Sequence, residues 1–137
     1  MLDFRAVFED KFQHFLKDVD YKVITVDPIQ FRVDAQIKDS LQFAIDKGNN
    51  VFEFEVRRTL FFAPYALYQL SVAFGAKLTI KKDAPDLNGI DWEAEFKNNV
   101  LFVNLISGLM AKISVLISQI TSSYGQTPMV TPPMLMN

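Results

Sequence analysis

The sequence has no cysteine, which excludes disulfides, thiol catalysis and thiolate metal sites. It has one histidine, His14, so a His–Cys pair or a multi-histidine metal site cannot be assembled. Only five glycines are present, and they form neither a Gly-rich phosphate loop nor a Gly-x-Ser-x-Gly elbow. We therefore expect a protein that is not an enzyme and that needs no cofactor and no metal.

Charge of either sign is not in excess, since 14 basic residues face 16 acidic ones. No basic block is present to neutralise a phosphate backbone, so nucleic acid is not an expected partner. Asp3, Glu9 and Asp10 interrupt the apolar residues at the N-terminus, which is unlike a secretory signal. The lack of cysteine fits the reducing cytoplasm, where we expect this protein to be located.

Apolar residues are abundant: they make up 50% of the chain, and 13 of the 137 residues are phenylalanine. The length is that of one ordinary domain, and we expect residues 1–137 to form a single domain. So many phenylalanines must pack inside, line a groove or meet another subunit.

The first segment, residues 1–18, has its apolar side chains spaced three and four apart, at Phe4, Phe8, Phe12, Phe15 and Leu16. Polar residues fill the positions between them, as in an amphipathic helix. The pattern predicts an N-terminal helix whose aromatic stripe packs on the domain's own sheet or docks a partner. His14 falls on the polar side of this helix, where we expect it to be solvated.

From residue 21 to residue 82 apolar and polar residues alternate, which is typical of antiparallel strands with one wet face. Asp27-Pro28 predicts a bulge, a bend or an edge, and Gly75 predicts a bulge. Residues 47–50, Lys-Gly-Asn-Asn, predict a turn. The simplest arrangement is a meander of three or four antiparallel strands.

A long helix is predicted over residues 91–123, with Asp91 as its N-cap, followed by an extended, Pro-rich apolar tail over residues 125–137. Residues 100–120 are apolar almost all round and long enough to cross a bilayer. Lys112 past the middle of the segment opposes this, because a charged side chain inside a membrane is costly. We favour a helix buried on two sides, one of them covered by the N-terminal helix or by a second copy of the chain.

Carboxylates offer only weak candidates for chemistry. Glu53 and Glu55 are neighbours on the predicted wet strand face, which would suit a cation or acid–base work, but a solvated face is the favoured interpretation. Asp83 and Asp86 lie in a loop that lacks the spacing of a calcium site.

Two stretches resemble the SecB family of export chaperones: the strand Leu70-Ser71-Val72-Ala73-Phe74-Gly75-Ala76-Lys77-Leu78-Thr79-Ile80, and the element Gly125-Gln126-Thr127-Pro128 followed by Met129 to Pro133. The resemblance covers about residues 20–133 and extends to SecB-like proteins of Gram-positive bacteria. It implies an α+β fold in which a four-stranded antiparallel sheet carries its helices on one face. It also implies dimers or tetramers and grooves that hold unfolded chains. More weakly, it implies docking of the translocation ATPase SecA on an acidic sheet face.

The chain departs from the family in its predicted N-terminal helix, in ending at Asn137 and in the mixed charge of its sheet face, so SecA docking is doubtful. We predict an ATP-independent, SecB-like protein that holds unfolded polypeptide and contacts it through Phe74, Leu78, Met129 and Val130. An adaptor for one folded partner, and a small enzyme or ligand carrier with a site between sheet and helix, stay open as alternatives.

Overall fold

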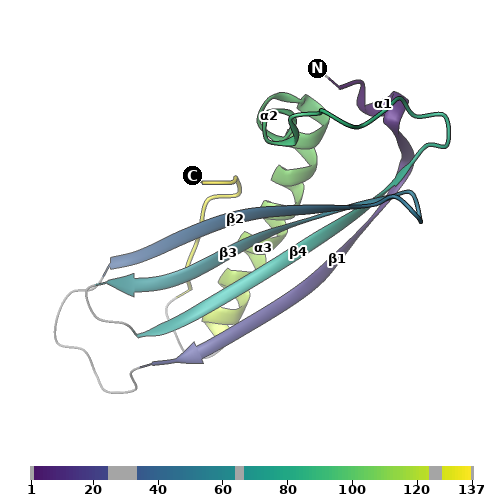
Figure 1. Ribbon diagram of the computed structural model, residues 1–137. Helices are drawn as coiled ribbons and strands as arrows, with labels where there is room; N and C mark the ends of the chain where they lie inside the picture. Colours follow the sequence, from purple (N-terminus) through teal and green to yellow (C-terminus); the bar gives the residue numbers. More distant parts are fainter. Residues whose placement is uncertain (1, 25–33, 64–66, 124–127, 137) are drawn as a thin grey trace.

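Alternating apolar and polar residues build most of the structure as long strands. The computed structural model describes residues 2–24, 34–63, 67–123 and 128–136. Its elements are α1 (Phe4–Val7), β1 (Phe8–Val23), β2 (Asp34–Asp46), β3 (Val51–Ala63), β4 (Tyr68–Ile80), α2 (Trp92–Asn98) and α3 (Val100–Ser123), as shown in Figure 1.

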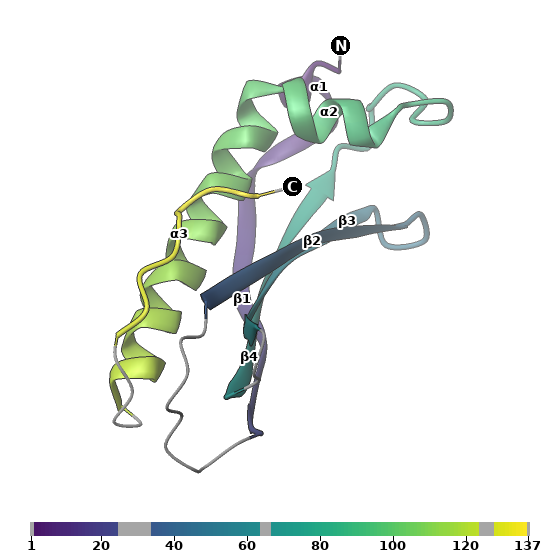
Figure 2. The same ribbon diagram turned by 90° about the vertical axis from the view of Figure 1, so that its left-hand side faces the viewer.

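The strands form one antiparallel sheet in the order β1-β4-β3-β2. The three strands β2, β3 and β4 are the predicted meander, whereas β1 pairs with the far edge of β4. Helix α3 lies on one face of the sheet, and α2 lies near α1 at one end of it (Figure 2). The predicted α+β fold with a four-stranded antiparallel sheet is confirmed.

The core lies between the sheet and the helices. Every second side chain of β3 points into it, beginning with Phe52 and Phe54. At the end of the sheet near α2, rings from strands and helices pack edge to face or tilted, at centroid distances that include 4.7 Å between Phe52 and Trp92 and 4.9 Å between Phe96 and Phe102. This cluster contains Phe4, Phe8, Phe43, Phe52, Phe54, Trp92, Phe96 and Phe102. Much of the phenylalanine excess is therefore used inside one subunit.

The predicted N-terminal helix over residues 1–18 is wrong. Only Phe4–Val7 is helical, and Phe8–Val23 is the edge strand β1. The register between β1 and β4 shifts twice, between Phe8 and Phe12 and between Leu16 and Asp18. Phe8, Phe12 and Leu16 lie on the face of β1 toward the helices and Phe15 lies on the opposite face, so that together they show the three-and-four spacing of a helix.

The predicted single helix over residues 91–123 is two helices. Asn99 is extended, and its side-chain Oδ1 accepts a hydrogen bond from the backbone N–H of Leu101 at 3.2 Å, which starts α3 anew. The predicted cap is confirmed, since Asp91 Oδ1 accepts from the backbone N–H of Ala94 at 3.2 Å. Helix α3 has the length and composition of a membrane span, but it packs on β3 and β4 as a core helix.

Gly75 does not form the predicted bulge, because the pairing of β3 with β4 continues through it without a shift. The turn predicted over residues 47–50 is confirmed, with Asn50 at a positive φ of 54°. Pro128–Met136 contains neither helix nor strand. The predictions for Asp27-Pro28 and for Gly125 lie outside the described residues.

Candidate functional site

Helix α3 is narrower than the sheet it covers. It contacts β3 and β4, so the same face of the two edge strands is left beside the helix rather than under it. A groove runs along each side of α3. The two grooves, and the C-terminal residues Pro128–Met136 that form part of the wall of one of them, are the candidate site.

On the β1 side, the strand register decides which side chains face the helix. Directly opposed residues of an antiparallel pair share a face, and Leu16 opposes Phe74 while Val19 opposes Val72. Val72 in the inner strand is fully buried, yet Leu16 and Val19 in the edge strand are 50% and 40% exposed. Phe12, on the same face, is 40% exposed. Together these three residues are an apolar row, which we call the β1 row.

The β1 row continues into a groove of about 350 Å³ between β1 and α3, the β1–α3 groove. It is almost wholly apolar, and it is lined by Phe4, Phe12, His14, Leu101, Asn104, Leu105, Gly108, Leu109 and Lys112. Its two ionisable side chains meet across it, with Lys112 Nζ 3.0 Å from His14 Nδ1. Partial burial, and secondarily the charge of Lys112, lower the pKa of His14 below its ordinary value of 6.5. The neutral imidazole therefore accepts the hydrogen bond from the ammonium group.

The β2–α3 groove on the other side of the helix is larger, about 490 Å³, and more polar. Its walls come from β2, α2, α3 and the end of the chain, and it is lined by Asp39, Ser40, Leu41, Glu93, Phe96, Lys97, Val103, Ile106, Ser107, Met134 and Leu135. Pro128–Met136, which we call the tail, runs along α3 toward β2 (Figure 2). Met129 and Thr131 of the tail are bound to α3 beyond the groove, and Met134 and Leu135 form part of the groove wall.

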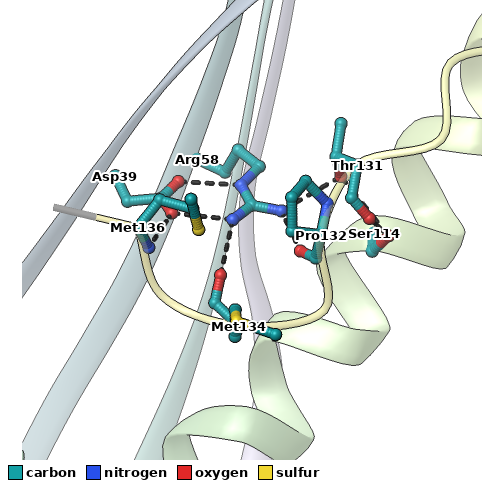
Figure 3. A network of polar contacts seen from close by, with 7 residues as sticks. All are labelled: Asp39, Arg58, Ser114, Thr131, Pro132, Met134 and Met136. Carbon is teal, nitrogen blue, oxygen red and sulfur yellow. Dashed lines mark hydrogen bonds and ion pairs between the residues drawn. The ribbon is translucent and has the colours of Figure 1, made fainter.

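An ion pair with fully buried side chains holds the tail (Figure 3). Arg58 of β3 and Asp39 of β2 are directly opposed in the sheet, and the carboxylate accepts from Nε at 2.8 Å and from Nη2 at 2.7 Å. The remaining guanidinium N–H groups donate to Thr131 Oγ1 at 3.0 Å, to the carbonyl of Pro132 and to the carbonyl of Met134 at 2.8 Å. All five donors of the guanidinium group are used, which is what a buried arginine requires.

Sequence analysis did not single out Arg58 and Asp39, although a signal exists. Arg58 has the same parity as Phe52, Phe54, Val56 and Leu60 on β3, and Asp39 stands between Ile37 and Leu41 on β2. Charges of opposite sign that interrupt two apolar faces indicate a buried pair.

The four predicted contact residues lie in different places. Phe74 is half-buried and lies beside Leu16 of the β1 row, whereas Leu78 is fully buried. Met129 and Val130 belong to the tail, the first half-buried against the core and the second 86% exposed. They do not share one groove.

The opposite face of the sheet is mixed in charge. Glu55 is paired with Lys17 at 3.5 Å, and Arg57 with Asp18 at 2.9 Å. His14 is exposed, as predicted, but it lies on strand β1 beside α3 and not on a helix. Among the residues that the structure describes, no three His, Asp or Glu side chains lie close enough together to hold a metal ion.

The fold is similar to that of the Mycobacterium tuberculosis Rv1957 SecB-like chaperone, solved in complex with a ChAD peptide from the Rv1956 HigA1 antitoxin. The TM-score is 0.66 at 11% sequence identity, over 91% of this chain and 88% of that chain. A protein of unknown function from Streptococcus agalactiae is also similar, with a TM-score of 0.47 and 13% identity over 91% of this chain and 98% of that one. No family model matches the sequence, and no curated protein matches it in sequence. The first likeness shows that this chain has a SecB-like fold, as the sequence resemblance implied.

Proposed function

We propose that this chain, which has the fold of a SecB-like chaperone, is an ATP-independent holdase that binds apolar segments of unfolded polypeptide in the cytoplasm. The observation that carries the proposal is the β1 row beside the β1–α3 groove. Three large apolar side chains, Phe12, Leu16 and Val19, stand 40–50% exposed on the face that is buried in the neighbouring strand. Contiguous apolar surface of this kind marks a site for another chain.

The edge of β1 supports the same proposal. In the described part of the chain, β1 pairs with β4 alone, so its outer backbone groups face no strand. An extended client can add its own backbone hydrogen bonds there while its side chains reach the β1 row. Phe74, which opposes Leu16, extends this contact surface. Leu78 is fully buried, so a client contacts it only if the client reaches the core. Met129 and Val130 contact a client only if it reaches the tail.

We also propose that the protein acts as a dimer or tetramer. Val100, Val103 and Val115 of α3 are 68%, 36% and 57% exposed, and a second copy would cover such apolar surface. The mixed charge of the open sheet face gives SecA no acidic surface, so SecA is a doubtful partner.

The test is suppression of aggregation of several unrelated, chemically denatured proteins, followed by light scattering, with the native mass measured in parallel. The wild type should suppress aggregation without ATP. The double variant Phe12→Ser/Leu16→Ser should lose most of this activity, while Ile24→Ser, which changes a 54% exposed isoleucine that neither lines the groove nor belongs to the β1 row, should keep it. Equal activity in the two variants would contradict the proposal.

A second function has one observation in its favour. The structurally similar Mycobacterium tuberculosis protein was solved with a peptide from an antitoxin, which is a single partner. An adaptor would protect only one client, so protection of several unrelated proteins separates a holdase from an adaptor.

A further inference from the structure

The tail is held chiefly through its main chain. Thr121 Oγ1 of α3 accepts from the backbone N–H of Met129 at 2.9 Å, and Ser114 Oγ donates to the carbonyl of Thr131 at 2.5 Å. Arg58 donates to the carbonyls of Pro132 and Met134, and Asp39 Oδ2 accepts from the backbone N–H of Met136 at 2.8 Å. Four side chains of the folded domain therefore form hydrogen bonds with five main-chain groups over eight residues of the tail.

The Arg58–Asp39 pair contacts main-chain groups around a bend of the tail at Pro133 and Met134. The arginine binds the carbonyls of Pro132 and Met134, which are two residues apart, and the carboxylate binds the N–H two residues later (Figure 3). A Pro-containing segment that bends at the same point would present its carbonyl and N–H groups to the pair in the same way. Pro132 and Pro133 suit these two positions, because no described group of the domain accepts a hydrogen bond from the main chain there and proline restricts φ.

The side chains of the tail contribute less than its backbone. Val130, Met134 and Met136 are 86%, 54% and 42% exposed. Only Met129 and Leu135 pack against the core, both half-buried. The side chain of Thr131 is the one polar exception, since it meets Arg58 and Ser114. An occupant with a similar backbone and two apolar anchors would satisfy the same contacts.

We propose that Asp39, Arg58, Ser114 and Thr121 form a second peptide-binding site, that the tail is its internal occupant, and that a Pro-containing apolar segment of another chain, bent as the tail is, displaces the tail. The site deepens the proposed holdase function, because its ligands are segments of unfolded clients. It lies on the β2 side of α3 and is separate from the β1–α3 groove.

Displacement exposes no unpaired charge, because Arg58 and Asp39 keep each other and the incoming backbone replaces the tail. A tethered tail acts as a competitor at high effective concentration. The site should therefore bind weakly in the full-length protein and more tightly when the tail is removed.

The probe is a synthetic nonapeptide with the sequence of Pro128–Met136, PMVTPPMLM, labelled at its N-terminus. Its binding is measured by fluorescence anisotropy to the full-length protein and to a variant that lacks residues 128–137. We expect the truncated variant to bind it at least about tenfold more tightly, because the tethered competitor is gone.

Two modified peptides test whether the site recognises main-chain groups of its ligand. Because only the peptide is changed, folding of the protein is not affected. N-methylation at Met136 removes the N–H that Asp39 accepts and should weaken binding by about tenfold or more, the loss expected for a hydrogen bond to a charged group. N-methylation at Val130, whose amide donates to no group in the described part of the chain, is the control and should leave binding close to that of the parent.

A reporter in the full-length chain remains usable if the truncated variant does not fold. The sequence has no cysteine, so Val130→Cys, at an 86% exposed position, accepts a single spin label. Excess unlabelled nonapeptide should increase the mobile fraction of the label, and the Met136-methylated peptide should do so only at higher concentration. A label that stays immobile at saturating peptide, or two methylated peptides that act alike, would overturn the inference.

The failure of this inference differs from the failure of the proposed function. If the tail stays bound but aggregation is still suppressed through Phe12 and Leu16, only the second site is lost. If the nonapeptide binds but Phe12→Ser/Leu16→Ser retains full activity, the holdase account based on the β1 row is lost and the second site stands.

Discussion

Phe15 lies over Gly75 so closely that a Cβ atom built on the glycine would be 2.6 Å from Phe15 Cζ. The two residues are directly opposed in β1 and β4, on the sheet face away from α3. Lys77 also lies over this ring, with Nζ 5.6 Å from its centroid. Glycine is present at this position because the aromatic ring occupies the space of a side chain.

Gly75→Ala should therefore destabilise the protein, because the added methyl group forces the Phe15 ring to move. We expect a loss of about 1–3 kcal/mol in the free energy of unfolding, measured with urea. In a Phe15→Leu background the loss should shrink. Gly108→Ala is the matched control: its Cβ would meet nothing within 4 Å. In the interior of α3 this change should stabilise by about 0.5–1 kcal/mol. Equal destabilisation by both substitutions would be incompatible with the contact.

Asp39→Ala should be far more costly than loss of a surface carboxylate, because it leaves the buried Arg58 without its counter-charge. The expected loss is about 3–5 kcal/mol in urea unfolding. Asp20→Ala is the control, since Asp20 pairs with Lys22 at 3.6 Å with both side chains largely exposed. Its loss should stay below about 1 kcal/mol. A small effect of Asp39→Ala would show that the pair is solvated.

The single histidine permits an unambiguous NMR titration. Partial burial and the charge of Lys112 lower the pKa of His14 below 6.5, so between pH 6.5 and the folded-state pKa the unfolded chain binds more protons than the folded one. The contribution of His14 to stability is therefore present above pH 6.5 and is lost as the pH falls from 6.5 to the folded-state pKa. Lys112→Met should raise the pKa of His14 toward 6.5. A wild-type pKa at or above 6.5 would contradict the observed contact.

Asp91→Ala should loosen α2, because the carboxylate accepts from the backbone N–H of Ala94 at the start of the helix. The expected loss is about 1 kcal/mol, within a range of roughly 0.5–2 kcal/mol for such caps. Asp91→Asn keeps an acceptor and should cost much less. Urea unfolding monitored by the fluorescence of Trp92, the only tryptophan, measures both. If both variants lose the same stability, the cap is not the cause.

The strands from Asp34 onward and the long helix follow from local patterns in the sequence, and their identity is confirmed. β1 does not follow, because its face toward α3 reads Phe12, His14 and Leu16 and then, after a one-residue shift, Val19, Tyr21 and Val23. The polar His14 breaks the apolar alternation, while Phe15 on the opposite face completes a helical spacing. Only the pairing of this segment with β4 shows that it is a strand and not a helix.

The grooves are also beyond a sequence argument. Whether an apolar side chain is core or contact surface depends on where the helix lies, and Leu78 is enclosed while Phe12, directly opposed to it, is 40% exposed. The path of the tail depends likewise on Arg58 and Asp39 meeting across β2 and β3. The alternation of apolar residues along each strand indicates that Arg58 and Asp39 are both buried. That they pair with each other follows only from the register of β2 against β3.

The central claim is that unfolded polypeptide binds along the β1 row, and site-specific photo-cross-linking tests it most directly. A benzophenone side chain is placed at Leu16, on the face toward α3, or at Gln42, an exposed position of β2 that opposes Glu55 on the other face. With a denatured client, the account predicts strong cross-links from position 16 and few from position 42. Equal yields at the two positions, or none at position 16, would contradict it.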